Sequence, residues 1–505
     1  MTHQAVFRCD ASPAIGGGHV MRCLALANAL AEAGWQSTFA TCASSTGVLP
    51  AISQSGHEIR VVNVAASQAA QADEIAAWYP DGIALLVADH YGLSAGFEHA
   101  GRSWAKEILV IDELADREHD CDMLLAPVPG CRPEDYRGRV PDECRYLTGA
   151  EYALLRPQFA RARQTARSRR SDRHDAGRIL VSFGAADGRR MTPRVLSALA
   201  DAGYRAPVTV IVGASAESAS VLTEMAPRLP YPISVLHDVD DMAAQMTAAD
   251  IAIMAAGSSL LEAASLGLPV VAVVTADNQQ RQGAAIHEAG AIRLAGDWNS
   301  LDLPALADMA LGLLRDPSTL QCMSENGMRL CNGRGASRAA LAISPPRDNA
   351  GNGIGLRPAS FNDAELMFRW QTTPGARKWM RNSAAPSYAE HMAWWQRRLQ
   401  MIDLDLYIVE APKPVGYVRV DGMADGRHEV SIMIDPDHAG RGVGTAALRA
   451  LRRLLPELPL HAEIRPGNLA SASIFAKAGY RQDGGNGWYR SDPIAAGSGD
   501  ARTTP

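Results

Sequence analysis

Short apolar runs alternate with amphipathic stretches along the first 340 residues of the chain. The run AVFRC (5–9) predicts a strand, and GHVMRCLALANALAEAG (18–34) predicts a helix that ends at the capping Gly34. The alternation continues with the apolar runs STFAT, HEIRVVNV, ALLVADH and EILVIDE, and then with RILVSFG, PVTVIVG, ISVLH, IAIMAAG and PVVAVVT. Strands that alternate with helices indicate parallel sheets covered on both faces. We therefore expect an α/β fold with two doubly wound, Rossmann-like halves in tandem.

Breaks in this pattern divide the chain. The polar, basic segment 161–177 indicates a linker or an exposed helix end, and the Pro-, Gly- and Asn-rich stretch 343–355 indicates a linker to a further domain. Beyond it cysteine disappears, and five of the nine tryptophans lie between Trp370 and Trp488. The expected organisation is a first half at 1–160, a second half at 177–340, a linker at 341–353, a C-terminal α/β domain at 354–490 and a disordered tail at 491–505.

The composition is that of an ordinary globular protein. Of 505 residues 47% are hydrophobic, and the net charge of −6 suggests no basic patch for nucleic acid. No apolar run reaches the roughly 18 residues of a membrane span, and the first strand starts too early to follow a signal peptide. Eight cysteines without a CxxC pair favour reduced thiols over disulfides or a zinc site. We expect a cytoplasmic protein, a monomer or weak homo-oligomer, without a metal, nucleic acid or membrane as partner.

The stretch IGGGHVMRC (15–23) joins the first predicted strand to the first predicted helix. The glycines 16–18 let a ligand approach the backbone and present N–H groups at a helix start. His19 then lies in the first turn, where the helix dipole disfavours the imidazolium form and leaves a ring that can accept a proton. Gly-rich turns also open many αβ units without binding anything, so this stretch alone is equally compatible with a capping role.

A second small-residue turn lies in IMAAGSSLLEAASLGLPVV (253–271). Its Gly-Ser-Ser sequence (257–259) offers N–H groups and hydroxyls at a helix N-terminus, which suit a diphosphate. Glu262 can accept from ribose hydroxyls or simply complement the helix dipole. Asn278 and Gln279 follow the next strand, where their amides can contact a sugar or phosphate or end the strand.

Together these motifs resemble the nucleotide-sugar enzymes of the GT-B fold. Within them, DASxxIGGGHVMRCLxLA (10–27) resembles the UDP-sugar hydrolases of pseudaminic acid biosynthesis. The same resemblance extends to DHYG (89–92), VIDELADR (110–117), CDMLL (121–125) and EYALLRPQF (151–159). It runs in order over most of residues 4–335.

The resemblance implies hydrolysis of UDP-2,4-diacetamido-2,4,6-trideoxy-β-L-altropyranose to the free sugar and UDP, with no metal. It implies that His19 activates the attacking water and that Tyr91 and Asn278 hold the sugar or the water. The residues it assigns to UDP-sugar binding are Gly17, Gly18, Gly257, Ser258, Ser259, Glu262 and Gln279. The family usually shows SxGGxD, whereas Ala185 replaces the second glycine here. The extra methyl group is expected to tighten or shift the nucleotide pocket.

A further glycine-rich turn opens a basic helix in DHAGRGVGTAALRALRRLLPEL (437–458). The N–H groups of residues 442–445 can clamp a pyrophosphate, assisted by the helix dipole and Arg441. A strand (LHAEIRP) and then NLASASIFAKAGYRQ (468–482) follow. This order of strand, RGxG turn, helix, strand, NxxS and helix resembles the GNAT acetyltransferases over about residues 354–490.

The GNAT resemblance implies acetyl-CoA as co-substrate, bound where two strands splay apart. The residues it assigns to acetyl-CoA are Ile434, Arg441, Gly442, Val443, Gly444, Thr445 and Asn468. The opening LRP (356–358) and the WxxxP…RxWM stretch (370–380) narrow the resemblance to aminosugar N-acetyltransferases of the same pathway. These acetylate the 4-amino group of the UDP-linked altrose-type sugar.

Some positions depart from the GNAT pattern. Ala439 stands where the motif usually has Gln or Arg, and Phe475 stands where many relatives carry a tyrosine that protonates the CoA thiolate. Ser473 and Tyr480 are alternative acids, although core packing also explains Tyr480. The pair His428–Glu429 can assist deprotonation of the amine or form a solvated strand end.

The sequence therefore predicts a bifunctional enzyme with an N-terminal inverting UDP-sugar hydrolase and a C-terminal aminosugar N-acetyltransferase. The alternative is a GT-B glycosyltransferase that passes its sugar to an acceptor, joined to a module that binds acetyl-CoA without turnover.

Overall fold

The computed structural model describes residues 3–12, 16–48, 50–172, 177–213, 216–403, 405–484 and 487–494. The chain divides into two compact units, Met1–Ala336 (unit 1) and Ser337–Pro505 (unit 2). Helix α14 (Gly335–Ile343) begins at the end of unit 1 and continues into unit 2.

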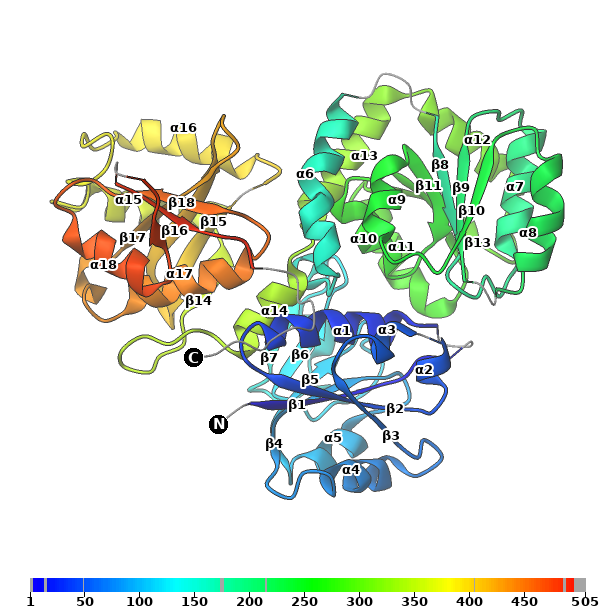
Figure 1. Ribbon diagram of the computed structural model, residues 1–505, viewed down its shortest axis with the longest axis horizontal. Coiled ribbons are helices and arrows are strands. Elements are labelled where there is room, and N and C mark those ends of the chain that lie inside the picture. Colours follow the sequence, from blue (N-terminus) through cyan, green and yellow to red (C-terminus); the bar gives the residue numbers. More distant parts are fainter. Residues whose placement is uncertain are drawn as a thin grey trace. The chain divides into compact units, whose positions relative to one another are not determined.

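The first half of unit 1 is built on a parallel sheet in the order β3-β2-β1-β4-β5-β6-β7. Its strands are β1 (Gln4–Cys9), β2 (Gln36–Thr41), β3 (Glu58–Val61), β4 (Ile83–Asp89), β5 (Ala105–Ile111), β6 (Met123–Ala126) and β7 (Arg145–Thr148). Its helices are α1 (Gly18–Ala31), α2 (Ser45–Val48), α3 (Pro50–Ser53), α4 (Gln68–Ala76) and α5 (Ala95–Gly101), with short 3₁₀ turns η1 (Pro133–Tyr136) and η2 (Ala150–Tyr152). Figure 1 shows α1 on one face of this sheet and α4 and α5 on the other. The strand order reverses between β1 and β4, and ligands bind beyond the strand ends at such a switch point.

The second half of unit 1 repeats this architecture with the order β10-β9-β8-β11-β12-β13. Its strands are β8 (Ile179–Ser182), β9 (Val208–Val212), β10 (Ile233–His237), β11 (Ile251–Ala255), β12 (Val270–Val274) and β13 (Ile292–Asp297). Its helices are α6 (Pro157–Ser171), α7 (Met191–Asp201), α8 (Ala219–Met225), α9 (Met242–Ala248), α10 (Ser259–Ser265), α11 (Gln280–Glu288), α12 (Leu303–Leu314) and α13 (Pro317–Leu330), with 3₁₀ turns η3 (Ala226–Arg228) and η4 (Asp277–Gln279).

Alternate residues of the central strand β11 face two different cores. Ala252 and Met254 pack with residues of α9 and α10, whereas Ile251 and Ile253 pack with residues of α7 and α12. Both side-chain rows are buried because helices cover both faces of a parallel sheet. The predicted class of two doubly wound halves is therefore confirmed. The apolar pattern did not predict β6, β7 and β13, and of these β13 is only half-buried, at a sheet edge.

The segment expected as a linker or exposed helix end is mostly the helix α6, and two of its arginines are buried. Arg163 donates to the carbonyl oxygens of Ser265 (2.7 Å), Met328 (2.7 Å) and Cys331 (3.0 Å). Arg170 donates in the same way to carbonyls of Met246, Ala249 and Leu266 at 2.8–3.0 Å. These carbonyls lie at the C-terminal ends of α9, α10 and α13, which have unpaired acceptors and a negative dipole end. Two arginines of this basic segment therefore cap the C-terminal ends of helices inside the second half.

Replacing Arg163 by Met is expected to lower the free energy of unfolding of unit 1 by about 3 kcal/mol, because three buried acceptors lose a charged donor. Arg161→Met, on an exposed position of the same helix, is the matched control and should change it by less than about 0.5 kcal/mol. Urea unfolding of the full chain followed by circular dichroism measures both. Equal midpoints for the two variants would contradict the capping role.

Unit 2 is built on one mixed sheet in the order β14-β15-β16-β17-β18-β20-β19. Its strands are β14 (Gly355–Pro358), β15 (Leu406–Ala411), β16 (Lys413–Gly422), β17 (His428–Ile434), β18 (Leu460–Glu463), β19 (Arg481–Gln482) and β20 (Trp488–Ser491). Its helices are α15 (Ala364–Thr372), α16 (Tyr388–Leu399), α17 (Val443–Leu454) and α18 (Leu469–Lys477), with 3₁₀ turns η5 (Phe361–Asp363) and η6 (Pro436–His438). Figure 1 shows α17 on one face of this sheet and α15 and α16 on the other, and separate apolar cores lie under them. Ser491 closes β20, and residues 495–505 of the expected tail lie outside the described residues.

Candidate active sites

His19 lies in the first turn of α1, beside the switch point of the first sheet. Its Nδ1 atom lies 2.5 Å from Oδ1 of Asp89, the last residue of β4, and both side chains are buried. Because a carboxylate can only accept, Nδ1 carries the hydrogen, and Nε2 is the nitrogen with a free lone pair. The carboxylate thus fixes the tautomer and the orientation of a ring that can act as a base.

Arg22, one turn further along α1, holds Asp89 from the other side. Its Nε donates to Oδ2 of Asp89 and its Nη2 to Oδ1, both at 2.6 Å, and Nη2 also lies 3.2 Å from Nδ1 of His19. Burial opposes ionisation of Asp89, but the charges of Arg22 and His19 outweigh it and hold the pKa of Asp89 well below its usual range. Asp89 is therefore a charged partner for His19 throughout the neutral range.

Glu113, in the loop after β5, is the second carboxylate at this site. Its Oε2 accepts from Nη2 of Arg22 at 3.0 Å, and its Oε1 accepts from the hydroxyl of Tyr91. Burial and then the charge of Glu113 raise the pKa of Tyr91, which keeps the phenol protonated. Sequence reasoning gave Asp89 and Glu113 no role, although Asp89 ends one buried apolar strand and Glu113 lies just after another, where ligands bind in such sheets.

Tyr91 and Asn278 are brought together from the two halves of unit 1. The Asn278 amide donates to the Tyr91 hydroxyl at 3.0 Å, and the Tyr91 ring packs edge-on against His19 with centroids 4.5 Å apart. The three residues predicted as catalytic thus lie in one cluster. Because the Tyr91 hydroxyl donates to Glu113 and accepts from Asn278, it can offer a water or a sugar only its remaining lone pair.

The glycine stretch lies close to the small-residue turn of the second half. Gly17 is the N-cap residue of α1, and Gly18 is its exposed first residue. A Cβ atom on Gly18 would lie 3.6 Å from Oγ of Ser258. Two parts of the predicted UDP-sugar site, from opposite halves, are therefore neighbours, whereas residues 13–15 lie outside the described part of the chain.

The remaining residues predicted to bind the nucleotide cluster around the N-terminus of α10. Gly257 and Ser258 precede the helix and Ser259 begins it, with Ser258 exposed. Glu262 is half-buried and lies 3.7 Å from Arg156, and burial raises its pKa despite that positive charge. Gln279 is committed through Oε1 to the Thr275 backbone N–H (2.9 Å), so only its NH₂ group, which lies near Gly257, can contact a ligand.

The departure at Ala185 falls on an exposed position. Its carbonyl accepts from the Gly213 N–H at 2.9 Å, which ties the turn after β8 to the end of β9. The methyl group therefore does not fill a buried pocket.

Among the described residues, no group of three or more His, Cys, Asp or Glu side chains is arranged to hold a metal ion.

Unit 2 contains a cavity of 1390 Å³ at the end of β17 and the start of α17. Six of the seven residues predicted to bind acetyl-CoA line it: Ile434, Gly442, Val443, Gly444, Thr445 and Asn468. Arg441 is not among the lining residues, and its carbonyl accepts from the Asn349 N–H at 2.9 Å. Ala439, which stands where the GNAT motif usually has Gln or Arg, also lines the cavity, so its backbone can still contact a ligand there.

The glycine turn of unit 2 needs its glycines. Gly440 and Gly442 have φ of 74° and 84°, a left-handed conformation that side chains disfavour. A Cβ atom on Gly442 would also lie 3.0 Å from the backbone nitrogen of Asn349 and closer still to its side chain. The turn brings its backbone N–H groups to the N-terminus of a twelve-residue helix, which suits a pyrophosphate.

The two strands beside this turn separate after a short parallel pairing. β17 and β18 pair only at His428 with Leu460 and at Glu429 with His461, although β17 continues to Ile434. The residues of β17 beyond this pairing line the cavity. Such a splay leaves backbone groups free to pair with an extended ligand.

Residues 354–481 match the family model of the acetyltransferase (GNAT) domain. This part of the chain is a GNAT acetyltransferase domain. GNAT membership implies that the domain uses acetyl-CoA.

Relatives extend the comparison to unit 1. The chain is 26% identical over 283 residues to the UDP-2,4-diacetamido-2,4,6-trideoxy-beta-L-altropyranose hydrolase of Campylobacter jejuni, covering 55% of this chain and 93% of that protein. It is 23% identical over 490 residues to the uncharacterized protein MJ1062 of Methanocaldococcus jannaschii, covering 94% and 96%. The crystal structure of Acinetobacter baumannii MurG covers 68% of this chain and 99% of its own, with a TM-score of 0.51 at 15% identity, which shows a shared fold. The chain thus joins a hydrolase-like part with a GT-B fold to a GNAT domain.

In the GNAT domain, the cavity holds an unforeseen ion-pair cluster. Arg381 donates to both oxygens of Glu429 (2.7 and 3.0 Å) and to Glu463 (2.6 and 2.9 Å), and all three residues line the cavity. Hydrogen bonds to Glu463 and the charges of both carboxylates raise the pKa of Arg381. Glu429 is only 12% exposed, so the interpretation as a solvated strand end is wrong for it.

The candidate acids of the GNAT domain are placed differently from one another. Phe475 and Ser473 line the cavity. Tyr480 is 3% exposed, packs edge-on against Phe475 in the core and is not a lining residue. Burial raises the pKa of Tyr480, so the core-packing interpretation fits it better than a role as acid.

Among the described residues, none of the helices has the length and apolarity that a transmembrane segment requires.

Proposed function

We propose that the chain is a bifunctional enzyme of pseudaminic acid biosynthesis. Unit 1 hydrolyses UDP-2,4-diacetamido-2,4,6-trideoxy-β-L-altropyranose, and the GNAT domain acetylates the 4-amino group of the preceding UDP-aminosugar. The observation that carries the proposal is the buried His19–Asp89 pair, placed beside a contact between the two halves, in a chain that also carries a GNAT domain. The cytoplasmic location and the monomeric or weakly oligomeric state stay predictions.

In the hydrolase step, Nε2 of His19 takes a proton from a water while the water oxygen bonds to the anomeric carbon. The bond from that carbon to the diphosphate oxygen breaks, and UDP leaves with the electron pair. Asp89 stabilises the imidazolium that forms, because it remains charged and hydrogen-bonded to Nδ1. The N–H groups and hydroxyls of 257–259 at the start of α10 would hold the diphosphate, and Glu262 and the Gln279 amide would contact the rest of UDP.

In the acetyl-transfer step, the glycine turn 440–445 would hold the pyrophosphate of acetyl-CoA, and the splay between β17 and β18 its pantetheine arm. The substrate amine attacks the thioester carbonyl, CoA leaves as the thiolate, and the amine loses a proton. Glu429 would take that proton on a lone pair that Arg381 does not use, because it lies in the cavity at the mouth of the splay. The thiolate is protonated by Ser473 or by water, since Phe475 and the buried Tyr480 do not supply a proton there.

The two reactions are consecutive, because acetylation makes the substrate that hydrolysis consumes. NMR of the full chain with UDP-4-amino-4,6-dideoxy-N-acetyl-β-L-altrosamine tests both. We expect free diacetamido sugar and UDP only when acetyl-CoA is present. Consumption of the UDP-sugar only after a separate sugar acceptor is added would favour a glycosyltransferase, and no consumption at all would refute the assigned substrate.

A further inference from the structure

We propose that Glu113 is a positioning residue of the His19 site and that it ties this site to the segment 278–281 of the second half. The inference rests on the proposed function of unit 1 for its rate measurement, but not for its spectroscopic measurement. The role is distinct from that of a catalytic residue, because the side chain of Glu113 contacts Arg22 and Tyr91 rather than His19.

Glu113 is the junction between two chains of contacts. Through Arg22 it reaches the carboxylate of Asp89 and hence Nδ1 of His19. Through the hydroxyl of Tyr91 it reaches the amide of Asn278 in the second half. Its side chain is 12% exposed, so these charged contacts are largely shielded from water.

The backbone of Glu113 makes a further contact to the second half. Nη1 of Arg281, in the first turn of α11, donates to the carbonyl of Glu113 at 3.3 Å, and Nη2 of the same residue pairs with Asp135 at 2.6 Å. The side chain of Glu113, through Tyr91, and its backbone carbonyl are thus both connected to the segment 278–281. A residue that bridges two halves in this way links the position of one half to the chemistry of the other.

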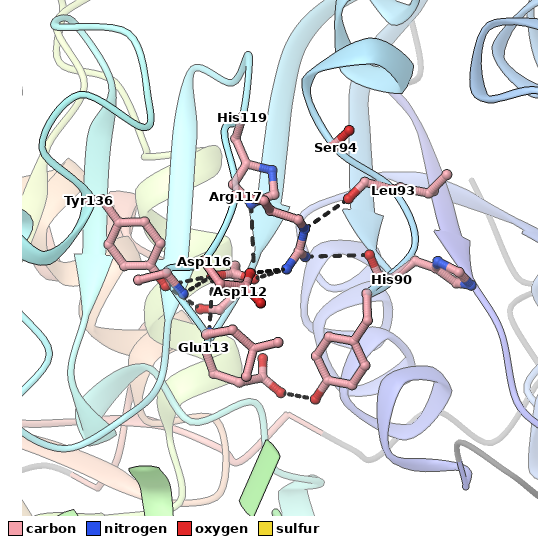
Figure 2. Close-up of polar contacts among 12 residues, drawn as sticks. His90, Leu93, Ser94, Asp112, Glu113, Asp116, Arg117, His119 and Tyr136 are labelled. Carbon is pink, nitrogen blue, oxygen red and sulfur yellow. Dashed lines mark hydrogen bonds and ion pairs between the residues drawn. The ribbon is translucent and has the colours of Figure 1, made fainter. Parts of the chain in front are cut away.

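The loop that carries Glu113 is anchored independently of the site. Figure 2 shows Asp112 at the centre of this anchor, with Arg117, His119 and Tyr136 around it and Glu113 turned away from it. Asp112 is fully buried and accepts from the backbone N–H groups of Leu114 (3.1 Å) and Ala115 (2.8 Å), while Arg117 pairs with it at 2.9 Å. The anchor fixes the backbone on both sides of Glu113, which leaves its side chain to be set by Arg22 and Tyr91.

The charges around His19 explain what Glu113 contributes. Arg22 from α1 and Asp89 and Tyr91 from the end of β4 contact this ring directly. Cys23 from α1 reaches it through Asp89, and Glu113 from the loop after β5 reaches it through Arg22. Arg22 is shared between two carboxylates. Without the charge of Glu113, the whole positive charge of Arg22 acts on Asp89 and His19, and the imidazolium that forms during reaction is less stable.

The test is Glu113→Gln in the full chain, with Glu118→Gln as the matched control. Glu118 is exposed, lies in the same loop and undergoes the same chemical change. For Glu113→Gln we expect kcat for UDP-sugar hydrolysis to fall about tenfold with KM changed less than about twofold. The acidic limb of the rate profile should move to lower pH by about half a unit or more, whereas Glu118→Gln leaves both unchanged.

An NMR titration of the His19 imidazole, assigned by loss of its signal in His19→Ala, needs no substrate. We expect its midpoint to move to lower pH in Glu113→Gln and to return toward the wild-type value in Glu113→Asp, which keeps the charge. A shift in a chain that does not hydrolyse the UDP-sugar would support the positioning role while refuting the proposed function. An unchanged midpoint in a folded Glu113→Gln protein would overturn the positioning role.

The link to the second half has its own readout. In a double-mutant cycle, Tyr91→Phe and Glu113→Gln should be non-additive, because both remove the same hydrogen bond. Their combined loss in kcat should therefore be smaller than the product of the single losses. Strict additivity would overturn the coupling through Tyr91.

Discussion

Replacing His19 by Asn is expected to lower kcat for UDP-sugar hydrolysis by about 10³-fold, with little change in KM. The base that takes the water's proton is lost, whereas the groups that hold UDP at α10 are untouched. Acetylation should continue, so acetylated UDP-sugar should accumulate when both substrates are supplied. NMR of the reaction mixture, together with initial rates of UDP release, measures both effects.

Asp89→Asn should lower kcat for UDP-sugar hydrolysis by about 10²-fold or more, for a different reason. Arg22 donates to both oxygens of Asp89, so it will claim the single amide oxygen of Asn and turn the NH₂ group toward Nδ1 of His19. The ring then carries its hydrogen on Nε2 and cannot accept a proton there. Because the pKa of Asp89 is already well below its usual range, the acidic limb of the wild-type profile does not come from this carboxylate over about pH 5 to 9.

The matched control for both variants is His90→Asn. His90 lies one residue beyond β4 and also contacts a carboxylate, with Nε2 at 3.2 Å from Asp10. It has no hydrogen bond to Asp89 or Arg22 in the described structure, and we expect its replacement to change kcat by less than about fivefold. If His90→Asn lowered kcat as much as His19→Asn does, the assignment of His19 as the base would be wrong.

Replacing Gly442 by Ala is expected to weaken acetyl-CoA binding and acetylation by about 10²-fold or more, while hydrolysis of supplied diacetamido substrate is unchanged. The added Cβ meets the backbone and side chain of Asn349, and the positive φ of 84° disfavours any side chain. The turn must shift, and with it the N–H groups that face the pyrophosphate. Calorimetric titration with acetyl-CoA and a thiol-release assay measure the two losses.

Gly479→Ala is the control for the cost of positive φ alone. Gly479 has φ of 91° and is not a lining residue of the cavity, and among the described residues only its chain neighbours come within 4 Å of an added Cβ. We expect a modest loss of stability, about 1 kcal/mol, and unchanged acetyl-CoA binding. Equal loss of binding in both variants would show that the effect is one of folding rather than of the turn.

Local sequence patterns were sufficient for the fold class and for the position of the turns. Alternating apolar runs predicted both doubly wound halves, because strands buried on both faces must be apolar along their whole length. The glycine stretches at 16–18 and 440–444 were also found from local sequence, and Gly16, Gly440 and Gly442 adopt the positive φ that favours glycine. Composition alone misled at α6, where buried arginines were interpreted as polar surface.

The partners of the functional side chains came only from tertiary structure. Asp89 lies 70 residues from His19, and Asn278 lies 187 residues from Tyr91. No local period encodes such pairs. Strand order in the first sheet brings β4 beside β1 and so Asp89 near His19, whereas the packing of the two halves brings Asn278 to Tyr91. The same holds for Arg381, whose contacts to β17 and β18 span 48 and 82 residues. Local patterns alone pointed to His19, Tyr91, Asn278 and the glycine turns, whereas the packing of strands and halves decided which side chains meet there and added Asp89, Glu113 and Arg381.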